Sequence, residues 1–440
     1  MPTAPRPRLQ ALAALATAFI VSGVAAPATA QDQCSTAGQT DFVHRVMEQY
    51  YLWYRDLPSV NPLVFDGPEA YLEAVRLRPR DDSFSYIALQ STTEAFFSSS
   101  EFVGIGFGSK RSGPERLRIT QVFPVSPAFD AGLRRGDRLT HIAGTEVSVL
   151  LDEGRLDEAL GPSEIGYEVG LTWLPHTNDS PLPPEPRSAL VVKRPVTIPT
   201  VSQRLVIDLD GRRVGYLHFR NFVEPSTDAL NEAFAKFQEE EVTELILDLR
   251  YNGGGLINVA QQLGGLIGGF RTSARVFLEM MHNDKNTQLN RRVRFDGSLL
   301  ALNLERVVVI TTRASASSSE LVINGLKPFI DVTVVGDTTL GKPVGQYRFD
   351  FCDKSLFPVS FQNVNADGDG DFFGGIAPDC VARDDLDFPL GDPQESSLDA
   401  ALSFLRDGSC RRPEAAGRTL RAISPGDDAQ FGLKQLINAR

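Results

Sequence analysis

The feature that most constrains this fold is the alternation of apolar strands and amphipathic helices from about residue 196 onward. Apolar runs of strand length lie at residues 214–219, 245–249, 307–311 and 332–335. Between them, residues 225–237 and 320–326 carry apolar side chains at helical spacing. Strands that alternate with helices favour a sheet whose strands are at least partly parallel. We therefore predict an α/β core over residues 196–410.

Two regions with different sequence patterns precede this core. Residues 31–100 carry apolar side chains four apart, such as Phe42, Val46 and Tyr50, which predicts a small helical domain. Residues 101–195 instead show short β-branched runs separated by Gly and Pro, which predicts a β-rich domain. The expected fold class is thus a multidomain α/β protein, in which residues 411–440 form a C-terminal tail.

The first 30 residues have the pattern of an export signal. Arg6 and Arg8 precede an apolar stretch, and Ala28-Thr29-Ala30 supplies small residues at a cleavage site. The apolar stretch is shorter than the ~20 residues that a membrane-spanning helix needs. We expect residues 1–30 to be removed as a signal peptide, which leaves an exported, periplasmic or secreted protein without a membrane span. An uncleaved membrane anchor is the alternative.

Cysteine usage agrees with export. The chain has 4 cysteines, an even number, and none of them stands in a CxxC or Cys/His metal spacing. This favours disulfides over zinc. Cys352 and Cys380 flank a stretch of predicted strands and turns, so we expect them to pair with each other. That leaves Cys34 and Cys410 as a link between the two ends of the chain.

The charge balance and an acidic segment bear on the binding partners. Lys plus Arg total 44 against 56 Asp plus Glu, a net charge of -12, which argues against nucleic acid as the main partner. Residues 365–371 alternate oxygen-bearing side chains as the first half of a calcium loop does, but position twelve is Ile376 in place of an acid. We therefore favour an acidic hairpin tip over a metal site, and we expect neither metal nor cofactor.

The β-rich region carries an ordered set of motifs. It begins with Gly104-Ile105-Gly106-Phe107, continues with Ser126-Pro127-Ala128, and reaches Gly136-Asp137 just before an apolar strand. This combination resembles a PDZ domain. PDZ domains bind a peptide C-terminus as an added strand, and the amides of a Gly-rich loop hold its carboxylate. By that resemblance Ile105, Gly106 and Phe107 form the carboxylate loop. An ordinary tight β-turn is the alternative.

The strongest candidate for catalysis is a run of small residues, Ser315 to Ser319, between the predicted strand 307–311 and the predicted helix 320–326. A strand-to-helix turn exposes side chains and offers free backbone amides that favour developing negative charge. Lys342 comes 25 residues after Ser317, and Gln346 follows four residues later. A Lys can deprotonate a Ser only while it is neutral, which burial without a carboxylate partner promotes. Taken alone, the Ser run is also typical of a solvated helix cap.

Several segments together resemble the carboxyl-terminal processing proteases, also called tail-specific proteases. The resemblance spans roughly residues 40–405 and rests on the segments 315–320, 335–342, 247–255 and 375–379. It implies a peptidase core with Ser317 as nucleophile, Lys342 as general base, and Gln346 as the residue that orients the Lys. It also implies an oxyanion hole made by the amides of Gly254 and Ser318.

The sequence thus predicts an exported serine endopeptidase that forms an acyl-enzyme through a Ser/Lys dyad. By the same resemblance, its PDZ domain would capture unfolded or tail-exposed proteins by their C-termini. The alternative is a non-catalytic binding protein of the same fold, or a PDZ scaffold that presents proteins to another hydrolase. Substrate identity, cleavage preference and homo-oligomer formation stay open at this point.

Overall fold

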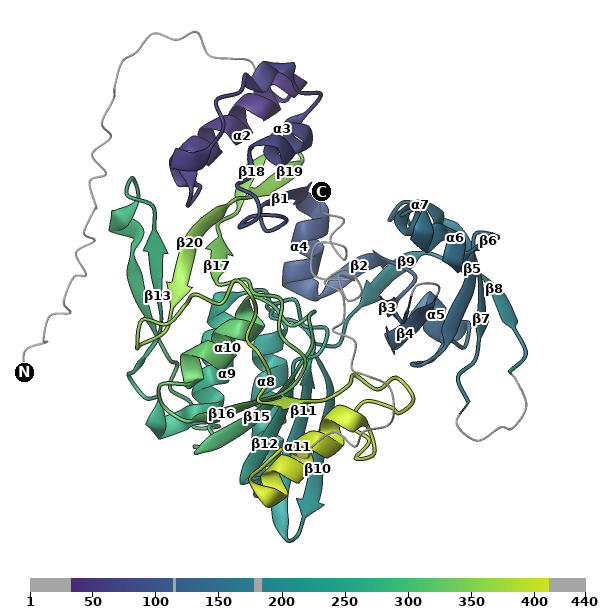
Figure 1. The fold of residues 1–440 in the computed structure, drawn as a ribbon, viewed down its shortest axis with the longest axis vertical. Helices are drawn as coiled ribbons and strands as arrows, with labels where there is room; N and C mark the ends of the chain where they lie inside the picture. The colour runs from purple at the N-terminus through teal and green to yellow at the C-terminus, as the bar shows by residue number, and fades with distance from the viewer. Residues whose placement is uncertain (1–32, 114–115, 178–183, 411–440) are drawn as a thin grey trace, which may run out of the picture.

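The computed structural model describes residues 33–113, 116–177 and 184–410 (Figure 1). The predicted signal peptide at residues 1–30 and the predicted tail at 411–440 lie outside the described residues. Within the described ranges, no helix is both long enough and apolar enough to span a membrane.

A six-stranded sheet forms the centre of the fold, with strand order β10-β11-β12-β15-β16-β21. Its strands are β10 (Val201–Leu209), β11 (Arg212–Phe219), β12 (Glu244–Asp248), β15 (Arg306–Thr311), β16 (Asp331–Gly336) and β21 (Cys380–Val381). The β10–β11 pair is antiparallel, whereas the neighbouring pairs from β11 to β21 are parallel. The predicted α/β core with partly parallel strands is confirmed.

Helices cover both faces of this sheet, which is why its strands are nearly continuous apolar runs. One face packs against α8 (Ser226–Glu239), α9 (Ile257–Gly268) and α10 (Ser318–Leu326). The other face packs against α11 (Ser396–Asp407), whose buried Leu398 and Leu402 lie in one apolar cluster with Ile246 and Ile310. Figure 1 shows these layers around the sheet.

The parallel strands decide where the candidate site lies. Because β12, β15 and β16 run in the same direction, their carboxyl ends meet at one edge of the sheet. The turns that leave this edge are residues 249–256, 312–317 and 337–343. These turns carry the Gly-rich segment, the Ser run and the Gly-Lys pair, so the fold gathers three distant motifs into one place.

The N-terminal helices pack on a late part of the chain. The N-terminal elements are α2 (Thr36–Tyr50), η1 (Tyr54–Asp56), η2 (Pro62–Val64), α3 (Pro68–Val75), β1 (Tyr86–Leu89) and α4 (Gln90–Ser99). β1 pairs with β19 (Lys354–Phe357), which in turn pairs with β18 (Phe349–Phe351). Buried residues of α2 and α3 share one apolar cluster with Val344, Leu356 and Val359. The predicted helices are present, and this cluster joins the N-terminal region to residues 344–359.

A second sheet stands beside the central one, with strand order β14-β13-β20-β17. Its strands are β13 (Val276–His282), β14 (Arg291–Arg294), β17 (Val344–Gln346) and β20 (Val359–Val364), and the 3-10 turns η3 (Gly269–Arg271) and η4 (Thr287–Leu289) flank β13. Figure 1 shows this sheet as a curved extension that reaches from the core toward the N-terminal helices. Lys342 lies just before β17, so this sheet carries the Lys side of the candidate site.

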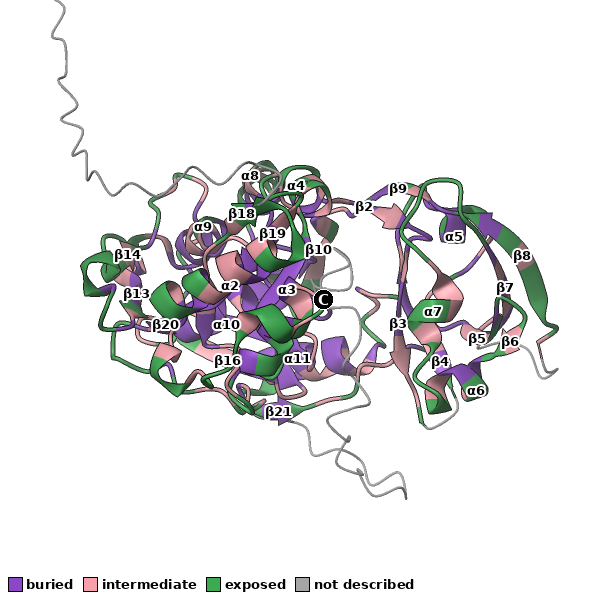
Figure 2. Cartoon of the chain, turned by 90° about the horizontal axis from the view of Figure 1, so that it is seen from above, coloured by how far each residue is buried: buried purple, intermediate pink, exposed green. Residues whose placement is uncertain are grey.

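The β-rich unit, residues 101–197, is joined to the rest by the antiparallel pair β2 (Glu101–Gly104) and β9 (Arg194–Thr197). Its own sheet and helices are β3 (Phe107–Arg111), β4 (Leu117–Val122), α5 (Pro127–Asp130), β5 (Arg138–Ile142), β6 (Thr145–Glu146), α6 (Val147–Asp152), α7 (Leu156–Leu160), β7 (Glu168–Leu174) and β8 (Arg187–Val192). Trp173 is buried in the core of this unit. Figure 2 shows the unit lying to one side of the rest of the protein.

Charged contacts fix the β-rich unit against the core. Asp384, almost fully buried, forms ion pairs with Lys110 at 2.5 Å and Arg135 at 3.0 Å. Arg250 of the core reaches the same carboxylate at 3.2 Å. Burial alone would raise the pKa of Asp384, but these three cations hold it well below its ordinary value. Paired charges therefore form one part of this interface, and an apolar cluster shared by the two parts forms another.

The disulfide pairing differs from the prediction. Cys34 bonds Cys352, and Cys380 bonds Cys410, whereas we expected Cys352–Cys380 and Cys34–Cys410. The predicted pairing is wrong because Cys352 lies in the β18–β19 turn, against which the N-terminal helix α2 packs. Cys380 lies in β21 at the edge of the central sheet, near the end of α11. Two cysteines that flank one stretch of chain therefore lie in different sheets.

Candidate active site

The Ser run forms the turn between β15 and α10, and hydrogen bonds distinguish its serines. The Ser315 hydroxyl donates to the Leu249 carbonyl at 2.8 Å. Ser318 and Ser319 donate to the carbonyls of Gly255 at 2.7 Å and Asn252 at 2.9 Å. The Ser317 hydroxyl donates to no group in the described part of the chain. Three of these four serines thus bind the Gly-rich turn, and one keeps its proton uncommitted.

Ser317 also has an uncommon backbone conformation. Its φ of 54° is positive, which side chains other than Gly adopt at a cost in free energy. The residue stands at the N-cap of α10, where its amide donates to the Glu320 carboxylate at 2.8 Å. The Ser317 side chain is half-buried and lines a cavity of about 1000 Å³. The turn therefore keeps the Ser317 hydroxyl at the cavity wall, although a positive φ is unfavourable for a serine.

Glu320 joins the two sides of the site. Its Oε2 accepts from the amides of Ser317 at 2.8 Å and Lys342 at 2.9 Å. Its Oε1 accepts from the Gly341 amide at 2.7 Å and the Thr339 hydroxyl at 2.5 Å. Complete burial raises the pKa of Glu320, while these four donors act to lower it. One carboxylate thus fixes the backbone of the Ser turn to the backbone of the Lys turn.

The Gly-rich turn after β12 packs directly on the Ser turn. Gly254 has a φ of +98°, and a Cβ atom built there would lie 2.8 Å from Ser317 Cβ and 2.9 Å from the Ser318 amide. Such distances exclude any side chain without a shift of the Ser turn. Asn252 joins the two turns, because its carbonyl accepts from the Ala316 amide at 3.0 Å.

Two backbone amides near Ser317 are unpaired. The Gly254 amide, which the sequence predicts as an oxyanion donor, donates to the Asn252 side chain at 2.9 Å in this structure. The amides of Gly253 and Ser318 have no hydrogen-bond partner among residues 33–113, 116–177 and 184–410. The amides of Gly253 and Ser318 are thus available to a ligand in this structure, whereas that of Gly254 is occupied.

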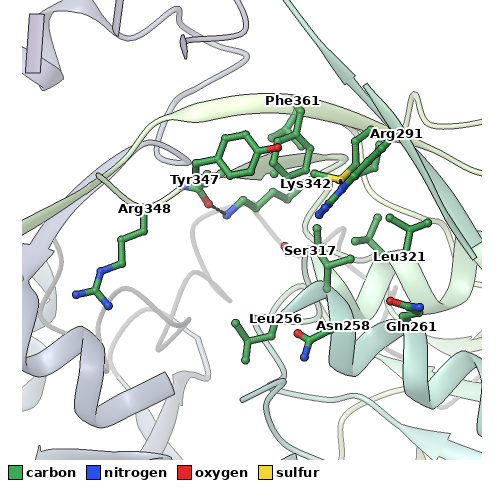
Figure 3. A pocket seen from close by; sticks show the side chains of 18 of the residues that line it. Leu256, Asn258, Gln261, Arg291, Ser317, Leu321, Lys342, Tyr347, Arg348 and Phe361 are labelled. Carbon is green, nitrogen blue, oxygen red and sulfur yellow. Dashed lines mark hydrogen bonds between the residues drawn. The ribbon is translucent and has the colours of Figure 1, made fainter. Parts of the chain in front are cut away.

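Lys342 approaches the same cavity from the turn before β17 (Figure 3). Its Nζ donates to Gln346 Oε1 at 2.5 Å and lies 5.7 Å from the centre of the Phe84 ring. Burial lowers the pKa of Lys342 to about 8, and the charges of Asp81 and Glu320 oppose this change. An amine with this pKa is neutral in a substantial fraction of molecules at mildly alkaline pH.

Gln346 is held so that its oxygen faces the Lys. Its Nε2 donates to the carbonyls of Phe84 at 2.6 Å and Phe357 at 2.9 Å. Both amide protons are thus used, which leaves Oε1 for Lys342. Within the described residues, no hydrogen bond joins Lys342 Nζ to Ser317 Oγ. The structure brings Ser317, Lys342 and Gln346 to one cavity, with the Lys bonded to Gln346 rather than to the Ser.

The predicted carboxylate loop is not part of this cavity lining and belongs to the β-rich unit. It precedes β3, which is an edge strand of its sheet. Gly106 has a φ of +93°, and a Cβ atom there would lie 2.2 Å from Ser126 Cβ. In the described chain the amides of Ile105 and Gly106 have no hydrogen-bond partner. Phe107 begins β3 opposite Val122.

The acidic segment forms a hairpin tip after β20. Asn365 Oδ1 accepts from the amides of Asp367 at 3.0 Å and Asp369 at 2.9 Å. Its side chain is therefore used to close the turn. Across the described ranges, no group of three His, Cys, Asp or Glu side chains is placed to hold a metal ion.

Two family models match this chain. The model of peptidase family S41 matches residues 213–382, and the model of the peptidase S41 N-terminal domain matches residues 38–86. The chain belongs to peptidase family S41. The first match covers the sheet edge with the Ser, Lys and Gly-rich turns. The second covers the α2 and α3 region that packs behind Lys342.

Relatives of this S41 chain include named proteases. It is 27% identical over 341 residues to the carboxyl-terminal-processing protease of Synechocystis sp. (strain ATCC 27184 / PCC 6803 / Kazusa). The matched region covers 76% of this chain and 73% of the relative. It is 22% identical over 348 residues to the probable CtpA-like serine protease of Staphylococcus aureus (strain COL), covering 78% and 64%. The chain thus spans less than two thirds of the curated relatives that it matches first.

A solved structure supports the same S41 fold. A Bacteroides fragilis NCTC 9343 protein assigned to the S41 proteases superposes with a TM-score of 0.69 at 28% identity. The match covers 83% of this chain and 97% of that one. The arrangement of the described regions is therefore shared with a crystal structure of the family.

Two residues that hold this S41 site together were not predicted from the sequence. They are Glu320, whose carboxylate binds both turns, and Asn252, whose side chain occupies the Gly254 amide. An acid three residues after a helix N-cap is a recognisable capping signal and could have indicated Glu320. No local signal could have indicated Phe84 and Phe357, which act through their carbonyls.

Proposed function

We propose that this chain is an exported serine endopeptidase in which Ser317 is the nucleophile and Lys342 the general base. One observation carries the proposal. Among the serines of the turn, only Ser317 keeps its hydroxyl proton uncommitted, and it shares a cavity with a Lys whose pKa is lowered to about 8. A reactive hydroxyl and a base of lowered pKa are the parts that nucleophilic catalysis needs.

The proposed reaction follows from the positions of these groups. Neutral Lys342 takes the Ser317 proton as Oγ attacks the carbonyl carbon of a substrate peptide bond. The amides of Ser318 and Gly253 stabilise the oxyanion, since both are free to donate. Lys342 then gives its proton to the leaving amine, and the acyl-enzyme is hydrolysed by a water that Lys342 deprotonates in turn. Gln346 is a positioning residue that holds the Lys in the cavity.

We extend the proposal to the β-rich unit, which would capture the C-terminal end of an unfolded or tail-exposed protein. The unpaired amides of Ile105 and Gly106 stand before an edge strand, where an added peptide strand would leave its carboxylate. Export is supported by the two disulfides, which persist in oxidising compartments.

The test is cleavage of an unstructured protein such as casein by the purified chain and by Ser317→Ala and Lys342→Ala variants. Ser99→Ala and Lys327→Ala, at exposed positions outside the cavity, serve as matched controls. We expect cleavage by the wild type and both controls and none by the two site variants. Cleavage that persists in Ser317→Ala would overturn the proposed nucleophile.

A second comparison tests the capture of C-termini. A model substrate with a free apolar C-terminus is compared with the same substrate amidated at that end. We expect amidation to raise KM, because the carboxylate no longer binds the loop at Ile105 and Gly106. If every variant binds the free tail and none cuts it, the chain is a binding protein or scaffold of the S41 fold instead.

A further inference from the structure

The cavity beside Ser317 has a charge that is unusual for this protein. The chain carries a net charge of -12, yet the cavity lining includes Arg291, Arg292, Arg294 and Arg348 besides Lys342. The acidic residues of the lining are Glu224 and Asp296. Some of these cations form ion pairs within the protein, and the others are available to a ligand.

Ion pairs account for part of this charge. Arg292 pairs with Glu279 at 2.5 Å, and Arg348 pairs with Asp350 at 2.6 Å. Arg291 and Arg294 have no carboxylate partner among the described residues, but Arg294 donates to the Ala274 carbonyl. The Nε of Arg291 donates to Met280 Sδ at 3.1 Å, which fixes one edge of the guanidinium and leaves both terminal amino groups unpaired. In Figure 3 the Arg291 side chain points into the cavity on the side of Leu321.

Strand register explains why Arg291 and Arg292 differ. Arg291 lies opposite Met280 and Arg292 lies opposite Glu279 in the β13–β14 ladder. Because successive side chains of a strand point to opposite faces, Arg291 and Arg292 leave the sheet on opposite sides. Both arginines line the cavity, but the charge of Arg292 is paired with Glu279, whereas Arg291 lies beside the apolar Met280.

The same row continues across the next strand to a polar group without a partner. Met280 lies opposite Asn363 in the β13–β20 ladder. Asn363 is only 1% exposed, and its Oδ1 is buried without a hydrogen bond in the described structure. A buried amide in this condition costs free energy unless a ligand pairs with it. Asn363 also lines the cavity that contains Ser317.

We propose that the row Arg291–Met280–Asn363 is a subsite that selects an acidic side chain, glutamate or aspartate, next to the scissile bond. This inference deepens the proposed function and rests on it. The Arg291 fork donates two hydrogen bonds to the carboxylate, and the Asn363 amide group donates a third. The amide can turn its NH₂ end toward the ligand because neither end holds a protein partner. The fixed charge of Arg291 favours a carboxylate over the isosteric carboxamide.

The test uses matched peptides that differ only at the residues flanking a mapped cut. The cut sites in casein are located by mass spectrometry, and peptides around one site are made with Glu, Gln or Lys at each flanking position. We expect the wild type to cleave the Glu peptide with a kcat/KM about tenfold above that of the Gln peptide. This preference should weaken at high salt, because Arg291 is exposed to solvent.

Variants of the two neighbouring arginines make the test specific. Arg291→Gln should bring the Glu/Gln ratio to about one, and Arg291→Glu should turn the preference toward Lys. Arg292→Gln removes a neighbouring cation of the same lining whose charge is already paired with Glu279, so it should change the ratio much less than Arg291→Gln does. Asn363→Asp should reduce the ratio without altering Arg291, because a second carboxylate would repel the substrate. An equal rate for the Glu and Gln peptides in the wild type, or a ratio indifferent to Arg291→Gln, would overturn the subsite.

Binding measurements separate failure of the subsite from failure of the proposed function. If the wild type cleaves both peptides equally, the peptidase proposal stands and the subsite is wrong. If it cleaves no peptide, the peptidase proposal fails, and fluorescence anisotropy of the labelled Glu and Gln peptides still tests the subsite. Tighter binding of the Glu peptide that is lost in Arg291→Gln would support it, and equal binding would contradict it.

Discussion

The two sides of the proposed dyad are held in place by different parts of the chain. The Ser317 turn is bonded to the Gly-rich turn and to α10, all within residues 249–320. Lys342 is instead bonded to Gln346, whose amide is oriented by the carbonyls of Phe84 and Phe357. The nucleophile is therefore held mainly by turns of the central sheet, with Glu320 as its link to the Lys turn, whereas the position of the base also depends on packing between the N-terminal region and the second sheet. Disturbances of these two parts should have separable effects.

The largest expected effect comes from the disulfide that joins the N-terminal region to the Lys side. Substitution of Cys34 and Cys352 by Ser removes a disulfide between residues 318 apart in sequence. The same substitution of Cys380 and Cys410 removes one between residues 30 apart. In the chain-entropy model these losses cost about 5.7 and about 3.6 kcal/mol of unfolding free energy. Urea unfolding of both double variants measures them. If the Cys380–Cys410 variant is the less stable one, the N-terminal tether matters less than we infer.

The next effect should come from Gly254, on the nucleophile side. Gly254→Ala places a Cβ atom 2.8 Å from Ser317 Cβ, so the Ser turn must move away from its amides. We expect kcat/KM to fall by about 100-fold, as for loss of an oxyanion donor. Gly297→Ala is the control, since a Cβ atom there would have no neighbour within 4 Å. A Gly254→Ala enzyme of normal activity would contradict the packing described for this turn.

A smaller and more diagnostic effect should come from Gln346→Glu, on the base side. The new carboxylate would stabilise protonated Lys342 and raise its pKa above about 8. Since the base acts only when neutral, wild-type kcat/KM should rise with pH up to about 8, and the variant should need a higher pH. Activity at pH 7 should fall about tenfold for each pKa unit gained. Gln394→Glu, at an exposed site, should leave the pH profile unchanged.

The smallest effect is expected for an exposed contact between the N-terminal region and the second sheet. Arg55 pairs with Asp284 at 2.6 Å, and both side chains are more than half exposed. Exposed ion pairs contribute little to stability because water and salt screen them. Arg55→Ala should therefore leave both the urea midpoint and the pH profile unchanged. A shifted pH profile would show that this contact, and not only the apolar cluster behind it, positions the base.

Features set by neighbouring residues could be predicted from the sequence, whereas features set by contacts between distant residues could not. The spacing of apolar residues predicted the strands and helices of the core, and the structure confirms this fold class. The pairing of Cys352 with Cys380 is wrong, because sequence proximity does not show that two cysteines lie in different sheets. The expected role of the Gly254 amide is not tested, but its bond to Asn252 makes Gly253 the better proposal.

By itself the sequence determined which segments become strands and helices, because apolar periodicity acts over a few residues at a time. It also determined which reactive groups are available, with Ser317, Lys342 and Gln346 at their spacing. Only the tertiary structure decided which serine hydroxyl stays uncommitted, which cysteines meet, and which arginines of the cavity lining are paired with a carboxylate. Each of these depends on distances between groups far apart in the chain, and packing, rather than local pattern, sets those distances.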